Sequence, residues 1–146
     1  MIAVVDSSVV IKWFVDEEDA ELALDLRRLA LVAPDLILAE CVNVFWKKVR
    51  KGEYAAPDAA LAIRSLERAG IALVACHGLA VRAHEISMQL DHPAYDCFYL
   101  ALCEVRGLPL ITSDGHLAKA VAARPTATNT SIIPLPEWKT RLNVPA

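Results

Sequence analysis

The chain has 146 residues, which is enough for one compact domain with a hydrophobic core of its own. Hydrophobic residues make up 55% of the sequence, and this share excludes an intrinsically disordered chain. The formal net charge of −3 excludes a uniformly basic nucleic-acid-binding surface, so any such surface must be a local patch.

Short apolar runs alternate with helical patterns along the chain. Apolar runs bounded by turn residues predict buried strands, and apolar residues spaced three or four apart predict helices. Gly52, Gly70 and Gly107 are expected to end helices, Pro57 to begin one, and Pro34 to break the chain. In chain order, we expect a strand at 2–5, helices at 8–14 and 18–31, a helix from Asp35 to about Lys51, a helix at 57–69, a strand at 71–76, helices at 79–90 and 93–106, a strand at 108–112, a helix at 117–123 and a strand at 131–135.

Strands separated by helices imply crossover connections and a parallel sheet that is covered on both faces. The sequence therefore predicts a single α/β domain over residues 1–146, a three-layer α/β/α sandwich with a central, mostly parallel sheet. In such sheets, ligands bind beyond the carboxyl ends of the strands. Asp6 and Asp114 both stand at predicted strand ends, so we expect them at the binding edge.

The four cysteines show neither a C-x-x-C motif nor a zinc-ligand spacing with histidines. This pattern favours free thiols in a reducing, cytoplasmic compartment. The N-terminus lacks the features of a signal peptide, and no apolar stretch is long enough to span a bilayer. We therefore expect a cytoplasmic protein with no membrane partner.

Four carboxylates, Asp6, Glu40, Asp96 and Asp114, stand where a soluble domain would normally bury apolar side chains. A buried ionised carboxylate loses its hydration and needs a partner, yet no basic residue is adjacent to any of the four in sequence. A divalent cation would resolve this cost. Oxygen ligands without His or Cys favour Mg²⁺ or Mn²⁺, and a metal site of this kind suits phosphodiester hydrolysis.

Each acid also has a structural explanation. Asp6 and Asp114 precede predicted helices, and taken singly each is better explained as an N-cap. Asp96 lies near the start of its helix, where an acid complements the helix dipole, although Asp91 is also available as a cap. The four acids together are more informative than any one of them.

Glu40 lies within a strongly apolar helical segment and could simply face solvent. Helical spacing places Asn43, a second oxygen donor, on the same face, which favours a functional role for Glu40. A separate apolar stripe on this helix is expected to consist of Leu38, Val42, Phe45 and Val49.

Four segments in this order resemble the PIN-domain ribonucleases, and more closely the VapC-type toxins of type II toxin–antitoxin systems. They are VVDSSVVIKWF at 4–14, LILAECVNVFWK at 36–47, YDCFYLALC at 95–103 and LITSDGHLAKA at 110–120. The resemblance implies a PIN-like fold and an acidic quartet that binds metal and carries out catalysis. The quartet falls on Asp6, Glu40, Asp96 and Asp114, with Ser8, Asn43 and Thr112 in supporting positions.

The activity that the resemblance implies is Mg²⁺- or Mn²⁺-dependent endoribonuclease cleavage of RNA phosphodiester bonds, often in a structured RNA such as tRNA. The implied partners are a small cognate antitoxin protein, whose C-terminal segment blocks the groove, and a second copy of the chain in a homodimer. A basic run after the Glu40 helix either contacts the RNA backbone or is a solvated helix end. Its members are Lys47, Lys48, Arg50 and Lys51.

Two rival functions stay open. One is a catalytically silent PIN-like module that binds protein or RNA, against which the intact quartet argues. The other is a phosphotransfer domain with Asp6 as its nucleophile. A haloacid-dehalogenase type of site needs a second Asp two positions later, where this sequence has Ser8, so this alternative ranks last.

Overall fold

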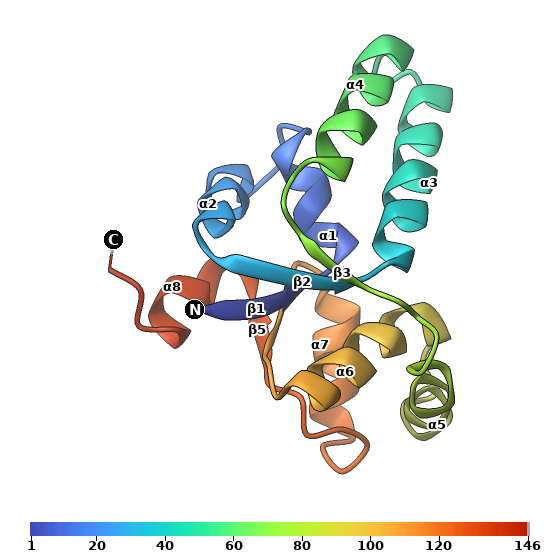
Figure 1. The fold of residues 1–146 in the computed structure, drawn as a ribbon, viewed down its shortest axis with the longest axis vertical. Helices are drawn as coiled ribbons and strands as arrows, with labels where there is room; N and C mark the ends of the chain where they lie inside the picture. The colour runs from blue at the N-terminus through green and yellow to red at the C-terminus, as the bar shows by residue number, and fades with distance from the viewer. Residues whose placement is uncertain (146) are drawn as a thin grey trace.

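The computed structural model describes residues 1–145 and shows a five-stranded sheet between two layers of helices (Figure 1). Ala146, the last residue of the expected domain, lies outside the described residues. The sheet has the order β3-β2-β1-β4-β5, and each neighbouring pair is parallel. The predicted three-layer α/β/α architecture is confirmed. The strands are β1 (Ile2–Val5), β2 (Ala30–Pro34), β3 (Ala72–Val74), β4 (Leu110–Thr112) and β5 (Ile132–Pro134).

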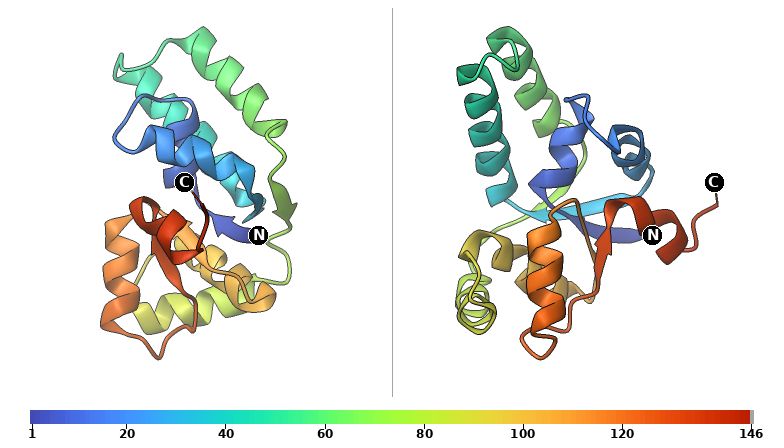
Figure 2. Two further views of the ribbon diagram at one scale, coloured as in Figure 1. Left: turned by 90° about the vertical axis from the view of Figure 1, so that its left-hand side faces the viewer. Right: turned by 180° about the vertical axis from the view of Figure 1, so that it is seen from behind.

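Helices cover both faces of the sheet. Helices α1 to α4 lie on one face and α5 to α7 on the other, as the views in Figures 1 and 2 agree. The helices are α1 (Ser7–Val10), α2 (Ala20–Asp25), α3 (Leu36–Arg50), α4 (Ala56–Glu67), α5 (Ala80–Leu90), α6 (Ala94–Arg106), α7 (Gly115–Ala123) and α8 (Trp138–Arg141), with 3-10 turns η1 (Ile11–Trp13), η2 (Leu26–Arg28) and η3 (Leu135–Glu137).

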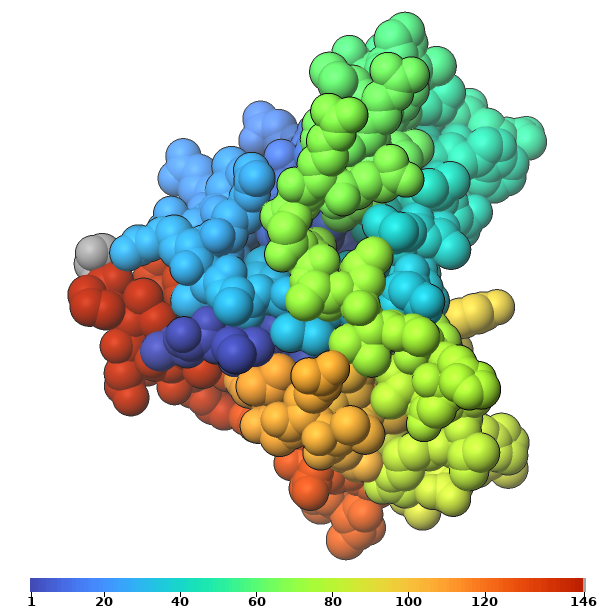
Figure 3. Space-filling model, viewed as in Figure 1, coloured from blue at the N-terminus to red at the C-terminus, as the bar shows by residue number. Residues whose placement is uncertain are grey.

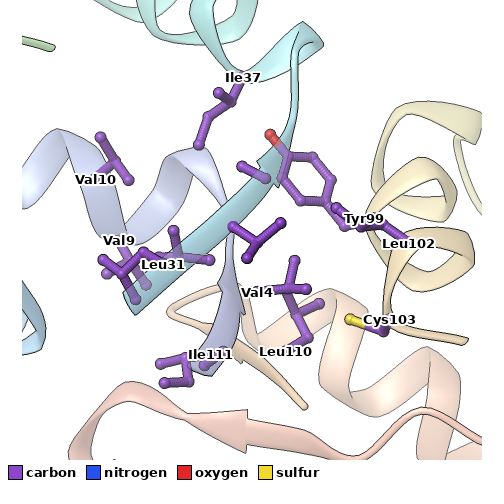
Figure 4. Packing of buried hydrophobic residues seen from close by; sticks show 14 of the residues in the cluster. Val4, Val9, Val10, Leu31, Ile37, Tyr99, Leu102, Cys103, Leu110 and Ile111 are labelled. Atoms are coloured by element: carbon purple, nitrogen blue, oxygen red, sulfur yellow. The ribbon is translucent and has the colours of Figure 1, made fainter. Parts of the chain in front are cut away.

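The core lies between β1 and the helices on either side of it. Val4 and Val5 are fully buried, as expected for a central strand with both faces covered. Helix α6 buries an unbroken run from Tyr99 to Cys103. Figure 4 shows Tyr99 and Leu102 of α6 beside Val4 and Leu110 of the sheet. Gly107 ends α6 in the left-handed conformation (φ 62°), as its position after the helix predicted.

Helices α3 and α4 form a ridge that projects from the body of the molecule (Figures 1 and 3). The buried residues of α3 are Ile37, Cys41 and Phe45, whereas Val42 is 44% exposed. Of the predicted apolar stripe, only Val42 is wrong, because Phe45 is buried and Leu38 and Val49 are partly buried and pack against the core. The apolar residues of this helix fit more than one stripe, and only the position of the sheet selects between them.

The predicted helix at 18–31 is wrong in its second half. Helix α2 ends at Asp25, a 3-10 turn follows, and Ala30–Pro34 form strand β2. The leucines of this segment continue the helical spacing up to Leu29 and conceal the start of the strand. Pro34 does not interrupt the sheet, because it is the last residue of the strand and its missing N–H lies at the end of the ladder.

The order of the strands reverses between β1 and β4. The chain runs from β1 outward to β2 and β3, and then returns to place β4 on the other side of β1. The helices after β1 and β4 leave on opposite faces, so a crevice opens at the carboxyl ends of these two strands. Within residues 1–145, no helix is long and apolar enough to cross a membrane, and all four cysteines are free thiols.

Candidate functional site

Asp6 lies at the carboxyl end of β1 and is only 4% exposed. Its carboxylate accepts two hydrogen bonds, one from the Ser8 hydroxyl at 2.5 Å and one from the Thr112 hydroxyl. Asp6 occupies the N-cap position of α1, but its side chain accepts no hydrogen bond from the backbone amides of the first turn. The capping explanation therefore fails for Asp6, and a different role is needed for a buried acid.

The backbone after β4 fixes the direction of both hydroxyls. The amide of Ser113 donates to Ser8 Oγ, and the amide of Asp114 donates to Thr112 Oγ1, each at 2.9 Å. A hydroxyl that accepts a backbone N–H still has one proton to donate. In both cases that proton goes to Asp6, so residues from β1, α1 and β4 jointly orient one carboxylate.

Asp114 follows β4 and acts as the N-cap of α7. Its Oδ1 accepts the amides of His116 at 2.9 Å and Leu117 at 3.3 Å. The capping explanation therefore holds for Asp114. The cap uses only one oxygen of this carboxylate, so Oδ2 can still accept a hydrogen bond or bind a cation.

Glu40 reaches toward the same edge from α3, and Tyr99 of α6 holds it there. The Tyr99 hydroxyl donates to Glu40 Oε1 at 2.5 Å. Figure 4 shows the hydroxyl of Tyr99 pointing away from α6. Burial raises the pKa of Glu40 from 4.5 to about 7; the Tyr99 hydrogen bond opposes this rise, and the charges of Asp96 and Asp6 add to it.

Asp96 stands in the first turn of α6, where His92 contacts it with Nε2 at 2.6 Å from Oδ2. Asp91 does not cap this helix, because it ends α5 in the left-handed conformation (φ 52°). The expected capping role of Asp91 is therefore wrong. Pro93 occupies the N-cap position of α6 and has no side-chain cap hydrogen bond, so Asp96 complements the helix dipole without competition from a capping acid.

The electrostatics of the edge follow from this crowding. Burial raises the pKa of Asp6 from 3.8 to about 6, and the charges of Asp96 and Asp114 add to the rise against the two hydroxyl hydrogen bonds. Within the described residues, no Lys or Arg forms an ion pair with any of the four predicted acids. The negative charge of the site is therefore not compensated by a Lys or Arg ion pair in the described part of the chain.

This donor set fits a hard divalent cation only in part. All four side chains offer oxygen, the ligand that Mg²⁺ and Mn²⁺ prefer. However, no three His, Cys, Asp or Glu side chains in residues 1–145 lie close enough together to hold one ion. Mg²⁺ is usually bound through one or two carboxylates and keeps several waters, so a site of this kind does not require three preformed ligands.

Two hollows adjoin the acidic edge. One, of about 360 Å³, is lined by Ser7, Ala39, Glu40, Asn43, Val44 and Tyr95. The other, of about 260 Å³, lies beside Lys12, Thr112 and Asp114. A further hollow of about 440 Å³ is lined by Glu104, Pro109 and Ser131 near the amino ends of β4 and β5, and contains none of the predicted site residues. The candidate site is therefore identified by its acidic residues and not by the volume of the hollow.

The four residues of the basic run at the end of α3 differ in whether they form ion pairs. Lys48 pairs with Glu17 at 3.0 Å and with Glu53 at 3.8 Å, so its charge is already compensated. Lys47, Arg50 and Lys51 are exposed and form no ion pair within residues 1–145. These three are better placed than Lys48 to contact a polyanion.

Sequence reasoning missed two residues that hold the acids. Tyr99 follows Asp96 by three positions on the same helix, so helical spacing indicates that both side chains lie on one face. His92 precedes Asp96 by four positions. His92 lies before the helix begins, and its contact depends on the turn between α5 and α6. The sequence carries no comparable signal for that turn.

Comparison with known proteins agrees with the geometry. The PIN domain family model matches residues 3–123. No curated protein sequence matches the chain significantly. The solved structures that the fold resembles include PAE2754 from Pyrobaculum aerophilum, with a TM-score of 0.72 and 19% identity over 99% of this chain and 91% of that chain.

Two other solved structures are similar. VapC20 of Mycobacterium tuberculosis, described as a sarcin-ricin loop cleaving toxin, has a TM-score of 0.62 and 16% identity over 82% of this chain and 95% of that chain. A toxin–antitoxin complex from Klebsiella pneumoniae has a TM-score of 0.57 and 17% identity over 90% of this chain and 95% of that chain. At these identities the likeness shows the fold. The match of the family model over residues 3–123 shows that the chain belongs to the PIN-domain family.

Proposed function

We propose that this protein is a Mg²⁺- or Mn²⁺-dependent endoribonuclease and the toxin of a toxin–antitoxin pair. The observation that carries the proposal is Asp6, a buried carboxylate at the β1/β4 crevice with acidic neighbours and no cationic partner among the described residues. Asp6 occupies the N-cap position of α1, yet its carboxylate accepts no backbone N–H there. Neither a helix cap nor an ion pair with Lys or Arg within residues 1–145 therefore explains this buried acid.

In this proposal, Asp6, Glu40, Asp96 and Asp114 hold the cation directly or through water. When bound, Mg²⁺ or Mn²⁺ offsets the negative charge of the phosphodiester and lowers the pKa of water. The hydroxyls of Ser8 and Thr112 keep Asp6 in one orientation. Asn43 lines the hollow beside Glu40, where its amide can orient water or phosphate.

RNA is the proposed substrate, and a structured RNA such as tRNA is one candidate. Lys47, Arg50 and Lys51 would contact its backbone, because a negatively charged site needs nearby cations to attract phosphate. Lys48 would take part only by giving up its ion pairs with Glu17 and Glu53.

The proposed protein partners are a small antitoxin and a second copy of the chain. The similarity to a toxin–antitoxin complex supports the first. Exposed apolar side chains support both, since Trp46 is 53% exposed and Leu61 is 64% exposed on the α3–α4 ridge.

Cleavage of purified RNA tests the proposal. The wild-type chain should cleave total RNA in Mg²⁺ or Mn²⁺ and stop in EDTA, whereas Asp96→Asn should fold normally and cleave nothing. Asp16→Asn, which removes an exposed acid that lines neither hollow beside the acidic edge, is the matched control and should cleave like wild type. Equal metal-dependent cleavage by Asp96→Asn and wild type would refute the assignment.

The silent binding module is the second candidate. The lack of a preformed three-ligand set within residues 1–145 favours it. It predicts RNA or protein binding without cleavage under any divalent cation, and the same assay with a binding measurement separates the two functions.

A further inference from the structure

Tyr95 differs from the other two tyrosines in the described part of the chain. Tyr99 is 1% exposed and its hydroxyl donates to Glu40, and Tyr54 donates to the backbone oxygen of Phe14 at 2.9 Å. Tyr95 is 69% exposed, and within residues 1–145 its hydroxyl makes no hydrogen bond. The ring neither fills the core nor fixes another residue, so the fold gives no reason for an aromatic side chain there.

The position of Tyr95 connects it to the acidic edge. It directly precedes Asp96 and lines the hollow of about 360 Å³ that also contains Glu40. Ala39 and Val44 supply apolar surface to this hollow, while Asn43 and Ser7 supply polar atoms. An exposed ring beside small apolar side chains, with an amide at the rim, is the combination that receives a flat, partly polar group.

A row of exposed side chains, two of them basic, continues from this hollow along α3. Asn43, Trp46, Lys47 and Arg50 recur at helical spacing and are all exposed. The guanidinium of Arg50 lies over the Trp46 ring, 5.2 Å from its centroid. A polyanion that approaches the acidic edge is attracted here, on the side of the site where Tyr95 stands.

We infer that the hollow lined by Tyr95, Glu40 and Asn43 receives an unpaired RNA base next to the cleaved phosphodiester, with the base stacked on the ring of Tyr95. The inference rests on the proposed function and narrows its substrate class to RNA that is unpaired at the cut. A base inside a duplex has both faces covered by its neighbours, so only an unpaired base can offer a face to Tyr95. Stacking accepts any base, because each has a π-face.

Binding measurements on a cleavage-deficient background test this inference. In Asp96→Asn protein with Mg²⁺, a fluorescent, unstructured RNA of about 16 nucleotides is compared with the same strand annealed to its complement. Adding Tyr95→Ala should weaken binding of the single strand by roughly 5- to 150-fold, the range expected for the loss of one stacked base. Tyr95→Phe should stay within about twofold, because the ring remains. Val105→Ala, which trims another exposed residue of α6, should change nothing.

An abasic scan shows whether the ring meets a base. One abasic position along the strand should weaken binding when Tyr95 is present and have no further effect in Tyr95→Ala, since the stacking pair is already lost. The inference is overturned if Tyr95→Ala binds the single strand as tightly as its parent, as it would if the hollow serves a protein partner. Equal losses for duplex and single strand, or no RNA binding at all, would also overturn it.

The two proposals fail in different ways. If wild type and Tyr95→Ala cleave RNA equally well, the nuclease proposal stands and the base pocket is refuted. If the protein binds RNA through Tyr95 but cleaves none in Mg²⁺ or Mn²⁺, the base pocket stands and the nuclease proposal is refuted.

Discussion

Replacing Asp6 by Asn should stabilise the metal-free protein. The pKa of Asp6 rises from 3.8 to about 6 because the carboxyl is buried beside other acids. Each pKa unit corresponds to about 1.4 kcal/mol, so the ionised carboxylate destabilises the fold by roughly 3 kcal/mol. The amide of Asn has a similar shape and no charge, and the Ser8 and Thr112 hydroxyls can pair with it by turning one proton.

The effect has a defined pH dependence. Between pH 3.8 and about 6 the folded chain binds the Asp6 proton more tightly than the unfolded chain, so this group's contribution to stability falls as pH rises. The penalty is complete above pH 6 and absent below 3.8. Asp6→Asn should therefore gain up to about 3 kcal/mol at pH 8, and the gain should vanish toward pH 4.

Urea denaturation followed by circular dichroism in EDTA measures this difference, and the matching rise in Tm is about 5–10 °C. The exposed Asp16→Asn serves as control and should shift the free energy of unfolding by less than about 0.5 kcal/mol. A loss of stability in Asp6→Asn at pH 8, or a gain of equal size at pH 4 and pH 8, would refute the argument from burial and charge.

Three further outcomes depend on the same geometry. Mg²⁺ or Mn²⁺ should raise the Tm of wild type and not that of Asp6→Asn, measured by thermal denaturation at increasing metal concentration, and equal shifts would contradict the role of Asp6. Thr112→Val keeps the shape but removes the donor to Asp6 and the acceptor for the Asp114 amide; it should lower the free energy of unfolding by about 1–3 kcal/mol in urea titrations and reduce RNA cleavage. Tyr99→Phe should raise the pKa of Glu40 further and increase the Mg²⁺ concentration needed for half-maximal cleavage, while an unchanged requirement would exclude a positioning role for Tyr99.

The layers of the fold were predictable from the sequence because strands and helices alternate with clear boundaries. Gly107 ends α6 as expected, and the apolar run at Ile2–Val5 is the central strand. Strand β2 was not predictable, because the leucines before it keep helical spacing and Pro34 resembles a break. Whether a short apolar run forms a strand depends on a partner far away, here β1 and β3.

The site was predictable only as a set of residue types at strand ends and on two helices. Asp6 and Asp114 were placed at the binding edge because the ends of parallel strands are readable from apolar runs. Ser8 and Thr112, which donate to Asp6, were expected from the family resemblance. The contact of Tyr99 with Glu40 was missed, since it spans 59 positions of sequence. The same limit applies to α3, where the buried stripe depends on how the helix is rotated against the sheet.

The pairing of β1 with β4 also governs when the site can exist during biosynthesis. Asp6 leaves the ribosome early, but the hydroxyl of Thr112 that orients it follows 106 residues later. Parallel strands joined over such long separations form slowly, because the loop must close before the contact is gained. A truncated or half-made chain therefore carries Asp6 without its surroundings, and the chemistry of the crevice begins only once β4 has docked beside β1.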